Sequence, residues 1–166
     1  RPKGFDATRK GIRSVLWRDD IGSELYWVEA NDEGDPKNNV TYRDIIYTLS
    51  NPFKGEKKEL HKTKLRFRNI RWSDTGHALV SERFWKNRSE ITSLINTRSR
   101  TLEKVLFDRK YDDIYSDPGS PILTKNNFGR NIFQIRKNSI LMIGQGGSPE
   151  GYRPFLSSFN TKSLDR

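Results

Sequence analysis

Hydrophobic and polar residues alternate with a period of two along most of this chain. In residues 43–50, RDIIYTLS, the apolar side chains of Ile45, Tyr47 and Leu49 recur at every second position. A β-strand places such residues on one face of a sheet, so this period predicts strands. The same pattern predicts further strands at SVLWR, ELYWVEA, KLRFRNIRW, HALVSERF, EKVLFD, NIFQIR, SILMIG and PFLSSFN. Clusters of Gly, Pro, Asn and Asp separate them and predict turns.

The stretch KLRFRNIRW contains a shift in this alternation. Leu65 and Phe67 alternate with arginines, but the next apolar residues are Ile70 and Trp72, which belong to the other phase. One extra residue between two in-phase halves of a strand is the pattern of a β-bulge. We therefore predict a single strand with a bulge near the middle of this stretch.

Residues 88–109 allow two interpretations. Their apolar residues also fit one face of a helix: Ile91, Leu94, Ile95, Leu102, Val105 and Leu106. The β-branched residues and the strand rhythm on either side favour two strands joined by a turn at NTRSRT, and this is our prediction.

A weak internal repeat indicates the architecture. Trp17-Arg-Asp19 precedes a glycine and an apolar strand, and Trp72-Ser-Asp74 does the same 55 residues later. A third strand–turn–strand unit, ILTKNNFGRNIFQI, follows at a similar distance. Four-stranded propeller blades recur at such periods. We predict an all-β fold, a partial β-propeller of about three blades built from antiparallel four-stranded sheets. The sheet edges of an incomplete propeller are uncovered, so we also expect self-association through exposed strand edges.

The amino-acid composition and net charge indicate which classes of partner the chain could bind. The 166 residues are 33% hydrophobic and 31% charged, with a formal net charge of +10. Such a charge favours acidic partners, although a solvated basic surface explains it equally well. There is no cysteine, and the two histidines lie 16 residues apart, so no metal-ligand pattern is present. No apolar run approaches the roughly 18 residues that span a bilayer. We predict neither a cofactor nor a membrane partner.

The glycine-rich stretch ILMIGQGGSPEG, residues 140–151, resembles three known loops. A dinucleotide-binding loop needs G-x-G-x-x-G before a helix, and a P-loop needs Gly-Lys-Ser/Thr; neither pattern is met. Gly146 and Ser148 begin the G-x-S-x-G of a nucleophile elbow, but Glu150 stands where the second glycine belongs. We interpret the stretch as a turn between two strands. His61 and His77 have no serine or carboxylate motif around them, so no catalytic residue is predicted.

Basic and aromatic residues are interleaved in KLRFRNIRW and in SERFWKNRSE. Stacking on aromatic rings combined with phosphate neutralisation is how single-stranded nucleic acids are bound. The same alternation also describes a strand with one wet face, and no recognised nucleic-acid signature is present. A stand-alone basic β-domain that binds nucleic acid or another polyanion is therefore the alternative function. A third interpretation is a propeller that serves only as an interaction module.

Four stretches, in order, resemble the propeller region of glutamyl endopeptidase-like serine peptidases of the prolyl oligopeptidase family. They are residues 11–49, residues 65–88, LFDRKYDDIYSDPGSP and GGSPEGYRPFL. The resemblance implies that residues 1–166 are part of an N-terminal propeller followed by a C-terminal α/β-hydrolase domain that carries the Ser-Asp-His triad. That domain is absent from this chain, so no catalytic residue is carried over. We expect the bacterial periplasm or export as the location, whereas the family analogy implies plastids.

The resemblance and the positive charge together predict a role in substrate access. The propeller of such a peptidase restricts and shapes the access of peptides to the active site. A guanidinium can bind a glutamate side chain through two parallel hydrogen bonds. We predict that one or more of Arg18, Arg71, Arg83 and Arg153 face the cavity between the domains, because each lies at a strand end or in the glycine-rich turn.

Overall fold

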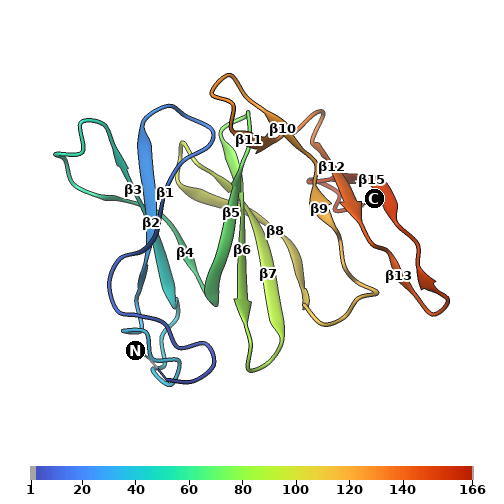
Figure 1. Cartoon of the computed structure of the whole chain (residues 1–166), viewed down its shortest axis with the longest axis horizontal. Helices are drawn as coiled ribbons and strands as arrows, with labels where there is room; N and C mark the ends of the chain where they lie inside the picture. Colours follow the sequence, from blue (N-terminus) through green and yellow to red (C-terminus); the bar gives the residue numbers. More distant parts are fainter. Residues whose placement is uncertain (1–2, 166) are drawn as a thin grey trace.

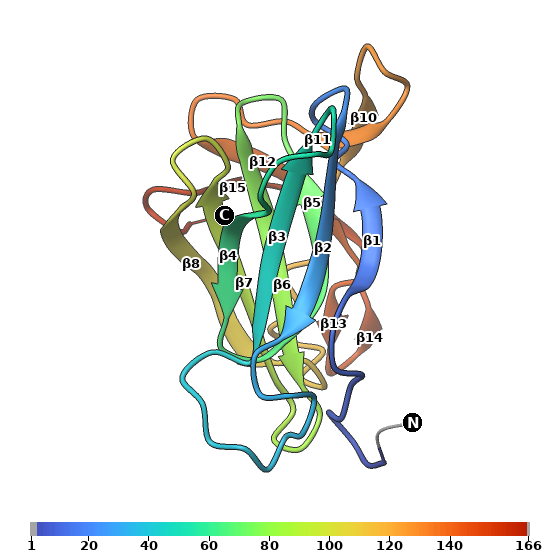
Figure 2. The same cartoon turned by 90° about the vertical axis from the view of Figure 1, so that its left-hand side faces the viewer.

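A computed structural model describes residues 3–165, which form antiparallel β-sheets and no helix. The first sheet has the strand order β1-β2-β3-β4 and the second the order β5-β6-β7-β8, so each is a meander of consecutive strands. Figure 1 shows the two sheets side by side, and Figure 2 looks onto the first sheet with the second behind it. Their strands are β1 (Arg13–Trp17), β2 (Glu24–Ala30), β3 (Asp44–Ser50), β4 (Lys58–Thr63), β5 (Arg66–Trp72), β6 (His77–Phe84), β7 (Ser89–Asn96) and β8 (Thr101–Lys110).

The remainder of the chain forms smaller sheets. A third sheet has the order β15-β12-β9, and two hairpins, β10-β11 and β13-β14, flank it. The third sheet is therefore three-stranded, where four strands were expected. Its edge strand β9 is only two residues long, and Pro121 in it has no N–H to donate to a ladder. The strands are β9 (Ser120–Pro121), β10 (Leu123–Lys125), β11 (Asn131–Phe133), β12 (Ser139–Gly144), β13 (Gly147–Ser148), β14 (Gly151–Tyr152) and β15 (Phe155–Asn160).

Two apolar clusters bind the three sheets into one stack. The cluster between the first and second sheets contains Tyr26, Val28, Ile46, Leu60, Ile70, Trp72, Ala78, Val80 and Ile95, with Ile132 from β11. The cluster between the second and third sheets contains Leu79, Leu94, Leu106, Phe133, Ile140, Met142 and Phe159. The second sheet is thus covered on both faces, and successive residues of β6 enter opposite clusters because side chains alternate along a strand.

A buried ion-pair network joins the first sheet to the start of the second. Arg66 donates from its two terminal nitrogens to the two carboxylate oxygens of Asp32, each at 2.7 Å. Asp44 accepts from Arg66 at 3.1 Å and from the backbone N–H of Phe67 at 2.7 Å, and it also pairs with Arg13. Charges buried at this depth need partners. The network therefore fixes the position of the start of β5, where the chain passes from the first sheet into the second.

Several sequence predictions are confirmed at residue level. Residues 89–110 form two antiparallel strands, so the helical alternative is wrong. The register of β5 against β6 shifts between Phe67 and Asn69, which is the predicted bulge. The repeated tryptophans Trp17 and Trp72 each end the first strand of a four-stranded sheet.

The glycine-rich stretch begins in β12 and continues into the β13–β14 hairpin that leads to β15, so it turns the chain between two strands, as the turn interpretation predicted. Gly146 has a φ of +63°, and a Cβ at this position would collide with the backbone carbonyl of Arg153. Arg153 in turn donates its N–H to the Gly146 carbonyl at 2.7 Å. A glycine is needed here because the backbone is left-handed and a second strand of backbone passes close by. Ser148 donates its hydroxyl to the Gly151 carbonyl at 2.7 Å, so it serves the turn.

Candidate functional site

A polar cleft lies between the second sheet and the segment that leads into the third. Its volume is about 350 Å³. We call it the arginine cleft, because four arginines of residues 3–165 line it: Arg68, Arg71, Arg83 and Arg109. Only two acidic residues, Glu90 and Asp117, share the lining. The arrangement therefore carries an excess of positive charge in a confined space.

Strand alternation brings these arginines together. The bulge in β5 turns Ile70 and Trp72 into the core with the first sheet. Asn69 and Arg71 consequently face the third sheet. In β6, Leu79 enters the cluster with the third sheet, and Arg83, four residues on, lies on the same face.

Two of the four arginines already have partners. Arg83 donates to Glu90 at 2.6 Å, and its guanidinium lies over the Tyr111 ring, 4.2 Å from the centroid. Arg109 lies 3.5 Å from both Glu90 and Asp117, and it donates to the carbonyl of Asp113 at 2.8 Å. These two arginines and Glu90 form a fixed, partly buried wall of the cleft.

The other two arginines are not engaged. Within residues 3–165, the side chain of neither Arg68 nor Arg71 makes an ion pair, a hydrogen bond or a ring contact. Arg68 is exposed, whereas Arg71 is partly buried. Between them, the side-chain oxygen of Asn69 is buried without a hydrogen-bond partner in the same part of the chain. The cleft can therefore offer two free guanidinium groups to a carboxylate.

Arg18 does not reach this cleft. It is 5% exposed and pairs with Asp20 at 2.7 Å and with Glu24 at 2.9 Å. Its guanidinium covers the Trp72 ring at 4.4 Å. The arginine is thus committed to the junction of the first and second sheets.

Arg153 also lies outside the cleft. It sits in the loop between β14 and β15, and its exposed side chain pairs with Glu150 in the neighbouring β13–β14 turn. Of the four arginines predicted from the sequence, the cleft therefore collects Arg71 and Arg83. Arg68 and Arg109 were not predicted. The alternation of arginines with Leu65 and Phe67 around the bulge was the signal for Arg68.

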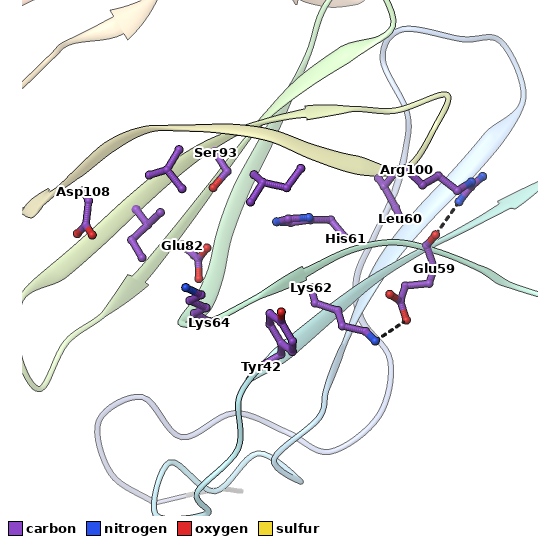
Figure 3. Close-up of a pocket in the computed structure, with 13 residues that line it drawn as sticks. Tyr42, Glu59, Leu60, His61, Lys62, Lys64, Glu82, Ser93, Arg100 and Asp108 are labelled. Carbon is purple, nitrogen blue, oxygen red and sulfur yellow. Dashed lines mark hydrogen bonds and ion pairs between the residues drawn. The ribbon is translucent and has the colours of Figure 1, made fainter. Parts of the chain in front are cut away.

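A second cavity, of about 290 Å³, lies on the opposite face of the second sheet. Figure 3 shows its lining, which comes from β4, the β4–β5 turn, and β6, β7 and β8, with Tyr42 and Arg100 at its rim. Among its lining residues, Glu82 and His61 have pKa values shifted from their ordinary values. Burial raises the pKa of Glu82 to about 7, and burial also lowers the pKa of His61. We call this the Glu82 cavity. His61 is only partly exposed.

No arrangement for nucleophilic catalysis is found in residues 3–165. The His77 ring bonds to the Thr75 hydroxyl at 2.9 Å and to Glu103 at 3.0 Å, and in residues 3–165 no hydrogen bond joins the imidazole of either histidine to a serine. The nearby Ser73 is buried, and its hydroxyl accepts the N–H groups of Thr75 and His77, so it stabilises the β5–β6 turn. The same residues contain no group of three or more His, Cys, Asp or Glu that could hold a metal ion. They also contain no helix with the length and hydrophobicity needed to cross a membrane.

Comparison with known proteins supports the resemblance found in the sequence. The chain is 41% identical to a probable chloroplastic glutamyl endopeptidase of Oryza sativa subsp. japonica, over 99% of its length. It is 40% identical to the protein of the same name in Arabidopsis thaliana, again over 99%. No family model matches the chain. Among solved structures, TolB from Acinetobacter baumannii aligns with a TM-score of 0.45 and 12% identity, over 88% of this chain and 30% of that one.

These relatives are much longer than the chain. The aligned region makes up 19% of the rice protein and 18% of the Arabidopsis protein. Nearly every residue of the chain nevertheless has a counterpart in them. The chain is thus homologous, along its whole length, to a segment of proteins named glutamyl endopeptidase.

Proposed function

We propose that the chain is a non-catalytic segment of a β-propeller that gates and shapes the access of acidic peptides to an α/β-hydrolase active site elsewhere in a longer polypeptide. Two consecutive four-stranded antiparallel sheets, stacked face to face with a third, are the arrangement of neighbouring propeller blades. The homology to glutamyl endopeptidases supplies the peptidase context.

The outer face of the third sheet supports the place of the chain in a larger stack. Leu141, Ile143 and Leu156 are 54%, 55% and 66% exposed. They alternate with buried residues of β12 and β15, such as Met142 and Phe159. A contiguous apolar sheet face is an interaction surface. A further sheet of the same polypeptide would cover it just as the third sheet covers the second.

The proposal that the substrates are acidic peptides rests on Arg68 and Arg71, the two arginines of the arginine cleft that have no ion-pair partner within residues 3–165. A glutamate side chain that enters between Arg68 and Arg71 would meet guanidinium groups that need not release another carboxylate first. A hydrogen bond to a charged group contributes about 1.5–3 kcal/mol. The net charge of +10 adds long-range attraction for acidic peptides.

Peptide titration of the 166-residue chain tests this function. A short peptide with one glutamate is compared with its glutamine counterpart, by isothermal calorimetry at low salt. We expect the glutamate peptide to bind at least about tenfold more tightly, and Arg71→Ala and Arg68→Ala each to reduce that preference about tenfold. Arg153→Ala removes an exposed arginine outside the cleft and is the matched control.

Two results would contradict the proposal. One is equal affinity for the two peptides, and the other is a loss of preference in Arg153→Ala as large as in Arg71→Ala. Tight binding of a single-stranded oligonucleotide that falls steeply with salt, without preference among peptides, would instead favour the nucleic-acid alternative. In the longer polypeptide, Arg71→Glu is expected to lower kcat/KM for glutamate-containing peptides and to leave alanine-containing peptides nearly unchanged.

A further inference from the structure

The Glu82 cavity has apolar walls and a carboxyl group in its interior. Leu60 comes from β4, Ile91 from β7, and Leu102 and Val105 from β8, so two sheets contribute to the walls. Figure 3 shows His61 and Glu82 projecting into the space between these strands. Ligand pockets are commonly of this kind, with hydrophobic walls and a few convergent polar groups.

Glu82 is buried without a counter-ion. It is 3% exposed, and no ion pair joins it to a basic side chain of residues 3–165. Its carboxylate accepts the backbone N–H of Leu65 at 2.5 Å, and the backbone N–H of Lys64 supports it too. Two backbone donors only partly offset the cost of taking a charge out of water. The pKa near 7 is the consequence of that cost.

The charged groups around Glu82 leave room for an added cation. Lys64, on the β4–β5 turn, lowers the pKa of Glu82 from a distance beyond ion pairing, whereas Asp44, on β3, raises it. Asp108, on β8, lines the same cavity, and its carboxylate has no ion pair or hydrogen bond within residues 3–165. Of the three acids among the described lining residues, Glu59 is paired with Lys62, whereas Glu82 and Asp108 have no ion pair, and the only free cation among these residues is Lys64.

The remaining cations at the rim are occupied. Lys62 pairs with Glu59 at 3.3 Å. Arg100 donates to the Thr48 hydroxyl at 3.2 Å and to the Glu59 carbonyl at 3.0 Å. These contacts hold both side chains at the mouth of the cavity, as the dashed lines in Figure 3 show for Glu59.

The other polar groups of the cavity are neutral. His61, on β4, has a pKa lowered by burial, so its imidazole is uncharged at neutral pH and can accept or donate one hydrogen bond. Ser93, on β7, is almost fully buried, and its hydroxyl has no hydrogen-bond partner within residues 3–165. Neither group would repel a cation, and each can accept a hydrogen bond from one.

We propose that the Glu82 cavity binds a small organic cation, a primary ammonium carried on a compact apolar group. The ammonium would lie against the Glu82 carboxylate, with Asp108, His61 and Ser93 as further acceptors. The apolar group would contact Leu60, Ile91, Leu102 and Val105. The ligand would supply the counter-charge that Glu82 lacks. This site is separate from the arginine cleft and does not depend on the function proposed for it.

The test is a titration of the full 166-residue chain with benzylamine, benzyl alcohol and benzoate, followed by NMR shifts of the Leu65 and Glu82 amides. We expect benzylamine to bind at least about tenfold more tightly than the other two at pH 8, because only it pairs with ionised Glu82. Below pH 7 the affinity for benzylamine should fall by about tenfold per pH unit, since the proton and the ammonium compete for one carboxylate.

Glu82→Gln keeps the shape and the acceptor for the Leu65 N–H, and it should lower the affinity for benzylamine at pH 8 at least about tenfold. Glu103→Gln removes a carboxyl of β8 that lies outside the cavity and should change nothing. Thermal unfolding of both variants verifies that they fold. Benzyl alcohol or benzoate binding as tightly as benzylamine would overturn the proposal. So would unchanged benzylamine affinity in a folded Glu82→Gln variant, or affinity that rises as the pH falls.

Discussion

Glu82 and Arg83 are neighbours in β6, yet their side chains line cavities on opposite faces of the second sheet. Strand geometry requires this, because consecutive side chains point to opposite sides. The acid lies towards the first sheet, in a mostly apolar cavity, and its pKa rises to about 7. The Arg83 side chain lies towards the third sheet, beside Glu90 and Tyr111. A single strand therefore separates a site suited to cations from one suited to carboxylates.

The burial of Glu82 predicts a pH-dependent stability. Its pKa rises from 4.5 in the unfolded chain to about 7 in the folded one. Between these values the folded state binds more protons, so the free energy of unfolding falls as the pH rises from 4.5 to about 7. The full loss is about 3 kcal/mol, at 1.36 kcal/mol per pKa unit. Glu82→Gln should recover much of this at pH 8 and little at pH 4.

Urea denaturation of the two proteins at several pH values measures the effect. The difference in unfolding free energy between Glu82→Gln and the parent should grow across the window from pH 4.5 to 7 and then level off. A difference that is constant with pH, or one that grows towards acid, would show that the Glu82 carboxyl is not the desolvated group described here.

The repeated tryptophans predict unequal costs of truncation. Trp72 is fully buried, meets Tyr26 edge-on at 5.5 Å and carries the Arg18 guanidinium on its ring. Trp72→Ala should cost about 3–5 kcal/mol, the usual range for a buried aromatic residue. Trp17 occupies the equivalent strand end in the first sheet but is 47% exposed. Trp17→Ala is the matched control and should cost only about 1 kcal/mol. Equal costs, measured by urea denaturation, would contradict this assignment of the core.

The fold was accessible from the sequence wherever one strand face is apolar. Alternation identified β2, β3, β6 and β12, and the phase shift after Phe67 located the bulge. The strand β4 was missed, because it is an edge strand of mostly polar residues in which only Leu60 and Thr63 are buried. An edge strand has a single hydrogen-bonded neighbour, so much of its pattern is set by solvent.

The candidate sites were only partly accessible. Position at a strand end picked out Arg71 and Arg83, which line the arginine cleft, together with Arg18 and Arg153, which do not; that any of them faces a cavity between domains stays a prediction. The fate of an arginine depends on which carboxylate lies near it in space, and the partners of Arg18 come from the turn and strand that follow it. The burial of Glu82 could not be predicted from the sequence. A single acidic residue in an apolar strand is usually interpreted as solvent-exposed, and only the three-dimensional structure shows that the first sheet covers it.

The exposed apolar face of the third sheet predicts self-association of the 166-residue chain. Leu141, Ile143 and Leu156 are each more than half exposed on neighbouring strands. Replacing Leu141 and Leu156 with serine should shift the chain towards the monomer in analytical ultracentrifugation, without loss of thermal stability. The control makes the same replacement by serine at Leu102 and Val105, which are exposed apolar residues of β8 on the second sheet. An equal shift in the control would show that the association is nonspecific and does not depend on the third sheet.

The turn at Gly146 predicts a position-specific penalty for a side chain. Gly146→Ala places a Cβ against the Arg153 carbonyl and forces a left-handed backbone on alanine. The left-handed conformation alone costs an L-residue about 1–2 kcal/mol, and the collision adds to it. Gly129 has a similar φ of +72°, but no atom lies within 4 Å of its would-be Cβ. Gly129→Ala should therefore show the conformational cost without the collision. A smaller loss of unfolding free energy in Gly146→Ala than in Gly129→Ala would contradict the close backbone approach and, with it, the assignment of GQGG as a turn shaped by packing.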